Sequence, residues 1–197
     1  IGGLQAVLPE LVKQPGTLRE HAFFLNEIAE QRRYLMSQPE EELAAELSLS
    51  GGNAWGKLQG TVTSQLTWEV ELDGKLQKLP MPAIINLRSH PDEPTRRRGY
   101  EAELAAWASV REPLAGAMNG IKGTVNTLNR KRGRSDALHA PLDINRIDRA
   151  TLEAMLAAMR ESLPSFQRYF LAKAKRLGKQ KLPWWDLFAP VSSNEHI

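Results

Sequence analysis

The sequence predicts a mainly α-helical fold: a bundle of antiparallel helices with one small β-hairpin insertion. Over most of the chain, apolar residues recur at steps of three and four, the period of a helix with one buried face. Only residues 67–80 alternate apolar and polar side chains, about an Asp73-Gly74 turn, as a hairpin does. We therefore expect N-terminal helices over 1–66, the hairpin over 67–80 and a long-helix bundle over 81–197, all within one helical domain.

Two capping-box patterns predict helix starts in the first part of the chain. Thr17 is followed three residues later by Glu20, and Ser37 is followed in the same way by Glu40. In a capping box the hydroxyl and the carboxylate each satisfy a backbone N–H at the helix start. A third helix is expected around an apolar stripe made of Trp55, Leu58, Val62 and Leu66.

The hairpin can be paired in two registers. A two-residue loop would place Val70 opposite Gln77. A three-residue loop would place Val70 opposite Leu76 and Glu71 opposite Lys75. We expect the second register, because it pairs opposite charges and like apolar groups across the strands.

The longest helix is predicted to begin near Pro94 and to carry a stripe for packing against another helix. We expect Pro113 to kink this helix, since proline removes a hydrogen-bond donor and clashes one turn back. Gly116, Gly120 and Gly123 form a smooth strip that allows close backbone approach. The stripe, which we expect to lie in the core, consists of Tyr100, Leu104, Trp107, Leu114, Met118, Ile121, Val125 and Leu128.

Two further helices are predicted towards the end of the chain. Asp148 is the candidate N-cap of the first, which carries an apolar stripe. Pro164 is expected to start the second helix and Gly178 to end it. The stripes of the two helices consist of Leu152, Met155, Leu156, Met159 and Leu163, then Phe166, Tyr169, Phe170 and Leu177.

The segment 177–191 is rich in apolar side chains and has neither a helical nor a strand period. It contains Trp184, Trp185 and Phe188. We expect a connector that another part of a longer protein covers, and that in the isolated chain packs onto the last helices or forms an exposed patch. The alternative interpretation is that these aromatic rings stack on a ligand.

The residue types needed for common catalytic sites are sparse. The chain has no cysteine, which excludes disulfides, thiolate metal sites and a cysteine nucleophile, and which fits a reducing cytosol. None of the four histidines has another at the i+4 spacing of a helical zinc site, and there is no phosphate loop. We therefore predict no catalytic residue, no metal ligand and no cofactor in this chain, and its substrate-binding residues are unknown. Asp186 and the loop 130–139 are the first places where substrate contact would be sought.

The formal net charge of +3 is concentrated in two basic clusters, residues 96–98 and 130–134. A nucleic-acid-binding protein could show such clusters, but solvated helix faces show them more often. No apolar run approaches the roughly 20 residues that span a bilayer, so no membrane contact is predicted.

A series of short stretches, taken in order, carries a family resemblance. They are Phe23–Arg33 leading into Leu35–Leu43, Asn53-Ala-Trp-Gly-Lys-Leu58, Arg96-Arg-Arg-Gly-Tyr100, Ala117-Met-Asn-Gly-Ile-Lys-Gly123, Asn145-Arg-Ile147, Arg168-Tyr169 with Lys173, and Leu177-Gly-Lys-Gln-Lys-Leu182 with Asp186 and Pro190. Together they resemble the oligoendopeptidase F branch of the thimet-type zinc metallopeptidases. Trp185 departs from the pattern, since the family often has Tyr there.

The resemblance implies a helical metallopeptidase that cleaves short peptides inside a deep channel. It implies a zinc ion bound by a His-Glu-x-x-His motif and a downstream Glu, with the motif Glu activating water. That motif is absent from this chain. The resemblance therefore implies the middle part of a longer cytoplasmic enzyme, inactive alone, which forms part of the channel wall.

The partners implied are short peptides for the whole enzyme and the rest of its own chain, namely N-terminal helices and a catalytic portion. Two other functions remain open at this point. One is a stand-alone basic helical module that binds nucleic acid, and the other is a helical scaffold that binds a partner protein.

Overall fold

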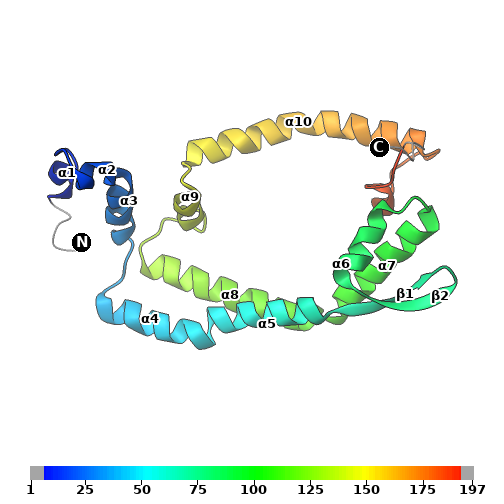
Figure 1. Cartoon of the computed structure of the whole chain (residues 1–197), viewed down its shortest axis with the longest axis horizontal. Helices are drawn as coiled ribbons and strands as arrows, with labels where there is room; N and C mark the ends of the chain where they lie inside the picture. The colour runs from blue at the N-terminus through cyan, green and yellow to red at the C-terminus, as the bar shows by residue number, and fades with distance from the viewer. Residues whose placement is uncertain (1–6, 192–197) are drawn as a thin grey trace.

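A computed structural model describes residues 7–191 and confirms a mainly α-helical chain with one antiparallel two-stranded sheet (Figure 1). The elements in chain order are α1 (Leu8–Leu11), α2 (Thr17–Glu20), α3 (Ala22–Arg32), α4 (Gln38–Ser50), α5 (Gly52–Gln65), β1 (Thr67–Leu72), β2 (Lys75–Pro80), α6 (Met81–Asn86), η2 (Leu87–Ser89), α7 (Glu93–Ser109), α8 (Arg111–Lys131), α9 (His139–Asn145), α10 (Arg149–Arg176) and η3 (Trp184–Asp186).

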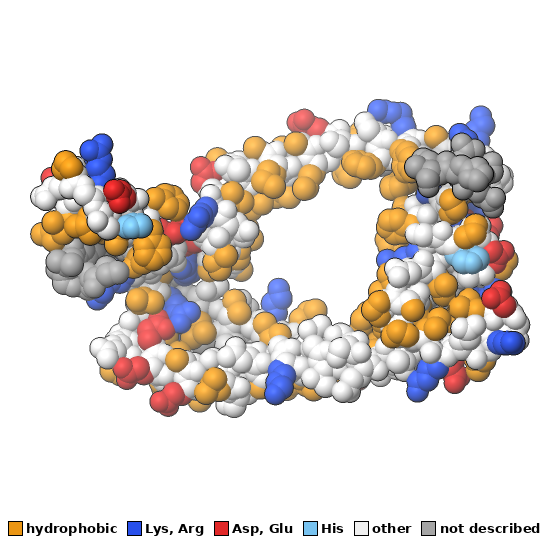
Figure 2. Space-filling model, viewed as in Figure 1, with side chains coloured by type: hydrophobic (Ala, Val, Ile, Leu, Met, Phe, Trp, Pro, Cys, Tyr) orange, Lys and Arg blue, Asp and Glu red, His pale blue; other side chains and the backbone are white. Residues whose placement is uncertain are grey.

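The helices follow one another around a central opening (Figure 1). α4, α5 and α8 form one long side, while α6, α7 and the hairpin form one end. α10 forms the opposite long side, and α9 lies between α8 and α10 at the other end. The space-filling view shows that side chains leave the middle of this ring open (Figure 2).

The apolar core lies at the hairpin end of the ring. There the sheet, α6 and α7 pack against one another, and Ile84 of α6 is fully buried. This corner holds the hairpin in place, because an isolated two-stranded hairpin is only marginally stable in water. The buried residues of the core are Leu66, Val70, Met81, Ile84, Ala102 and Ala106.

The hairpin register differs from the expected one. Val70 pairs with Gln77, as a two-residue loop requires, so the expected pairing of Val70 with Leu76 is wrong. Asp73 and Gly74 both have positive φ, 52° and 71°, which is the type I′ turn whose twist suits the strands. Val70 is 3% exposed in the core and Leu76 is 66% exposed. The turn therefore sets the register, and the strand-to-strand charge pairing does not.

Of the two predicted capping boxes, only the second forms. The Glu40 carboxylate accepts hydrogen bonds from the Ser37 N–H at 3.0 Å and from its hydroxyl at 2.6 Å. Thr17 is the first residue of α2 and its N-cap is Gly16, so the first box is wrong. Gly16 has a φ of 129°, which only glycine adopts without strain. Helix α2 therefore begins at Thr17, one residue before the predicted first helical residue.

The predicted long helix is divided into α7 and α8 at Val110. Pro113 lies in the first turn of α8, where proline is tolerated, so it follows a helix break and does not kink a continuous helix. The expected burial of the apolar stripe is wrong for several of its members. Leu104, Met118 and Val125 are 53%, 62% and 46% exposed.

The packing of α8 on α5 uses small residues. Ala117 is fully buried, and a Cβ atom added at Gly120 would lie 2.4 Å from the Trp55 ring. The predicted close approach is thus confirmed at Gly120, while nothing lies within 4 Å of a Cβ at Gly123. Because α8 packs on α5 through the side that carries these small residues, part of the apolar stripe of α8 is left uncovered.

The two predicted C-terminal helices are one continuous helix, α10, which has Pro164 inside it. The Asp148 side chain accepts from the Thr151 N–H at 2.7 Å, which confirms the cap. Pro164 removes a single helical hydrogen bond on an exposed helix, where water can replace it, so the helix continues. Gly178, with φ 73°, follows the helix end as predicted.

Candidate functional site

A buried ion pair joins the C-terminal segment to the start of α7. Arg96 donates to Asp186 Oδ1 from Nε at 3.0 Å and from Nη2 at 2.7 Å. Its Nη1 donates to the carbonyls of His90 and Pro91 at 2.7 and 2.8 Å. The Arg96 side chain is 4% exposed and Asp186 is fully buried. The guanidinium thus holds together segments that are 90 residues apart in the sequence.

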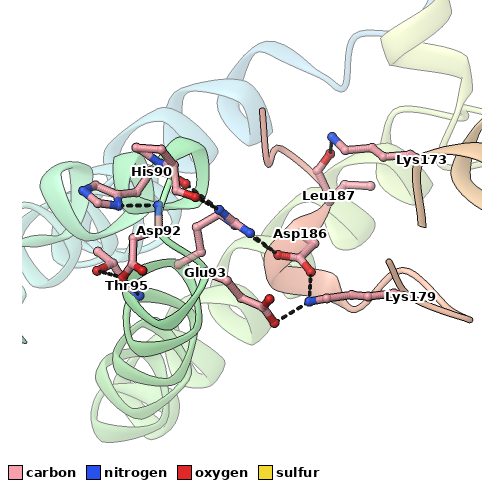
Figure 3. A network of polar contacts seen from close by, with 10 residues as sticks. His90, Asp92, Glu93, Thr95, Lys173, Lys179, Asp186 and Leu187 are labelled. Carbon is pink, nitrogen blue, oxygen red and sulfur yellow. Dashed lines mark hydrogen bonds and ion pairs between the residues drawn. The ribbon is translucent and has the colours of Figure 1, made fainter. Parts of the chain in front are cut away.

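Two lysines extend this network (Figure 3). Lys179 forms ion pairs with both Asp186 and Glu93, and Lys173 donates to the Leu187 carbonyl at 2.8 Å. Burial raises the pKa of Asp186, but the hydrogen bonds and charges of Lys179 and Arg96 outweigh it and hold that pKa below its usual value. Burial and the nearby Arg96 lower the pKa of Lys173. Asp186, where substrate contact would have been sought, is therefore closed to a ligand.

The loop 130–139 forms a second polar corner, between α8, α9 and the N-terminal helices. Arg132 donates to Glu41 of α4 at 2.9 and 2.6 Å. Arg134 pairs with Asp143 of α9 and donates to the Gln31 side chain at 2.7 Å. These cations therefore tie helices together, and the basic loop is not a row of unpaired charges.

The carboxylates of these corners and caps predict how stability depends on pH. Hydrogen bonds from Arg132 hold the pKa of Glu41 below its ordinary 4.5, and those from Arg96 and Lys179 hold that of Asp186 below 3.8. The pKa of each of these carboxyl groups is lower in the folded chain than in the unfolded chain. The stabilisation that the groups provide is therefore complete when the pH is above their unfolded pKa values, and it is lost as the pH falls through their folded pKa values. We expect a Tm that is nearly constant between pH 7 and 5.5 and falls below about pH 4.5. A Tm that stays constant or rises down to about pH 3 would contradict this assignment.

An apolar groove of about 640 Å³ lies between α4 and α8. Its apolar lining includes Leu43, Leu47 and Leu128, of which Leu43 and Leu47 are more than half exposed. Its polar lining includes Glu40 and Lys131, together with serine and threonine hydroxyl groups. The groove can therefore accept an apolar side chain while offering charges of both signs nearby.

A second pocket, of about 580 Å³, lies between α10 and the C-terminal segment. It is lined by Ser165, Phe166, Tyr169, Phe170, Leu187 and Phe188. Phe188 is 55% exposed and Trp184 is 63% exposed, whereas Trp185 packs against Tyr100 with ring centroids 5.7 Å apart. Trp184 and Phe188 therefore form the exposed patch that was expected, but Trp185 packs on α7 and not on the last helices.

No metal centre is found within residues 7–191, where no three His, Cys, Asp or Glu side chains are grouped to hold an ion. His90 Nδ1 accepts from the Asp92 N–H at 3.0 Å, and His139 Nδ1 accepts from the Ser135 N–H at 3.2 Å. His196 lies outside the described residues. Of the described helices, none is long and apolar enough to cross a membrane.

Comparisons with known proteins point to one kind of peptidase. A family model described as Oligopeptidase F matches residues 5–68. Over 186 residues the chain is 20% identical to Oligopeptidase PepF of Bacillus subtilis, a match that covers 93% of this chain and 28% of that protein. Over 177 residues it is 23% identical to Group B oligopeptidase PepB of Streptococcus agalactiae, covering 89% of this chain and 30% of that protein.

A solved structure has the same fold. The crystal structure of oligoendopeptidase-F from Enterococcus faecium matches with a TM-score of 0.78 and 20% identity, over 96% of this chain and 38% of that one. The chain thus spans less than a third of the length of the two curated relatives and just over a third of the solved one.

Proposed function

We propose that this chain is a non-catalytic helical portion of an oligoendopeptidase F-like enzyme and that it forms part of the substrate-channel wall. One observation carries the proposal. Nearly all of this chain matches the fold of part of a longer oligoendopeptidase-F chain, with a TM-score of 0.78 over 96% of its length. The division into N-terminal helices (1–66), hairpin (67–80) and long-helix region (81–197) belongs to the same proposal.

The chemistry of the whole enzyme would come from outside this chain. The described residues offer no donor set that fits zinc, so zinc would be held by a catalytic portion elsewhere in the enzyme. When bound, such an ion activates water and polarises the scissile carbonyl. The proposed substrates are short peptides, the proposed partners are the N-terminal helices and the catalytic portion of the same enzyme, and the proposed location is the cytoplasm.

The groove between α4 and α8 is the part of this chain best suited to the channel wall. Leu43 and Leu47 offer exposed apolar surface to a peptide side chain, and Glu40 and Lys131 offer charges to its polar groups. A concave apolar surface with a few polar groups is typical of a small-ligand site.

The isolated chain is expected neither to bind zinc nor to hydrolyse a fluorogenic peptide. In an enzyme of the relatives' length, Leu47→Asp is expected to raise KM for that peptide about tenfold with little change in kcat, since about 1.4 kcal/mol of apolar contact is lost. Steady-state kinetics measure both constants.

Leu49→Asp is the matched control, because Leu49 is also on α4 and is 72% exposed but does not line the groove. Equal KM values for the two variants would remove the groove from the channel wall. Chelator-sensitive cleavage by the isolated chain would contradict its non-catalytic role.

Nucleic-acid binding is not favoured by the described residues. The two basic clusters lie at opposite ends of the ring, at the start of α7 and at the end of α8 (Figure 1). Arg96, Arg132 and Arg134 of these clusters are ion-paired within the chain. A phosphate backbone needs basic side chains on one face that are available to it.

A further inference from the structure

α10 carries an apolar stripe that is exposed over residues 153–169 and half-buried only at its two ends. Every residue from 153 to 169 is exposed, although the helix is 28 residues long. Helices in proteins are stabilised mainly by packing of an apolar face, so a stripe of this length indicates a missing contact. Figure 2 shows apolar side chains along the side of α10 that faces the central opening.

The spacing of the stripe indicates what kind of element would cover it. Its apolar residues follow one another at steps of four, three, four, three and four, which is the seven-residue repeat of a helix that packs along another helix. The members are Leu152, Leu156, Met159, Leu163, Phe166 and Phe170. This pattern fits a second helix lying along α10, and it does not fit an extended peptide or a flat surface.

The aromatic pocket continues the stripe at its C-terminal end. Phe166 and Phe170 belong to both, and the pocket of about 580 Å³ has the size to hold a large apolar side chain. Such a pocket is the usual place for the anchor residue of a helical partner.

The occupant can be chosen from the position of the stripe and from the lengths of the related proteins. A second copy of this chain would have to insert its own α10 into the ring, because the stripe faces the opening. By contrast, the curated relatives have more than twice as many residues outside the matched region as within it.

We propose that the stripe of α10 and the aromatic pocket are the docking surface for an apolar helix from the remainder of an enzyme of the relatives' length. This inference rests on the proposed function. Under this proposal, α10 forms an interface between two parts of the enzyme and does not line the substrate channel. The opening of the ring at α10 is then filled by protein, and substrate does not pass along it.

Cysteine labelling tests this directly, because the chain has no cysteine of its own. Met159→Cys lies on the stripe, and Ala157→Cys lies two residues away, on nearly the opposite side of the helix, and is also exposed. In the isolated chain both should react with a maleimide at similar rates. In the intact gene product, position 159 should react at least about tenfold more slowly than position 157. Mass spectrometry of the labelled peptide measures each site alone.

The outcomes separate the two proposals. Equal rates at the two positions in a gene product much longer than this chain would overturn the docking surface and leave the proposed function standing. Protection of position 159 in the isolated chain, with a dimer in solution, would assign the stripe to a second copy and also overturn it. A gene product no longer than this chain would overturn both.

Discussion

Replacing Asp186 with asparagine is expected to lower the free energy of unfolding by about 3–5 kcal/mol. Asp186 is fully buried and accepts two hydrogen bonds from Arg96, which is itself 4% exposed. Removing the carboxylate charge leaves the guanidinium buried without its counter-ion, and the desolvation cost of that cation is no longer offset. Urea unfolding of the isolated chain, followed by circular dichroism, measures the loss.

The matched control is Glu101→Gln, which breaks the exposed ion pair between Arg97 and Glu101 on the same helix. Surface pairs of this kind contribute little, so a change within about 0.5 kcal/mol is expected. Replacing both buried partners, Arg96→Met with Asp186→Leu, should recover part of the stability, because neither charge of the pair is then buried without the other. If Asp186→Asn costs no more than Glu101→Gln, the buried pair does not hold the C-terminal segment on α7.

Two glycine-to-alanine substitutions on α8 are expected to change stability in opposite directions. At Gly120 the added Cβ would lie 2.4 Å from the Trp55 ring, so α5 and α8 must move apart or the ring must rotate. Overpacking of this kind costs about 1–3 kcal/mol. At Gly123 nothing lies within 4 Å, and alanine there should stabilise the helix by up to about 1 kcal/mol.

The difference in stability between the two variants isolates the packing cost at Gly120, since both substitutions gain the same helix propensity. Thermal unfolding of the two proteins under one condition measures it. A stabilised Gly120→Ala variant would mean that α5 and α8 do not pack through this glycine.

Some local signals in the sequence predicted local structure, although the Thr17–Glu20 box and the helix start at Pro164 were wrong. The Ser37–Glu40 box, the Asp148 cap and the Gly178 end depend only on neighbouring residues, and each forms as expected. The hairpin was also placed correctly, but its register depended on the choice of turn, which cross-strand charge pairing does not determine.

Burial and long-range pairing could not be predicted in the same way. A helical stripe shows which face is apolar, but Met118 and Val125 show that it does not reveal whether that face is covered within the chain. The Arg96–Asp186 pair joins residues 90 positions apart, and neither residue lies in a local motif from which the pairing could be predicted. The α4–α8 groove likewise forms from segments whose proximity depends on the fold.

The intact mass of the gene product in its source cells tests the central claim most directly. An antibody raised against this chain would identify the product, and its mass would be measured in the fraction assayed for peptidase activity. The account predicts a mass about three times the 22.1 kDa of this chain, with zinc-dependent cleavage of short peptides in the same fraction. A product of 22.1 kDa with no such activity would contradict it.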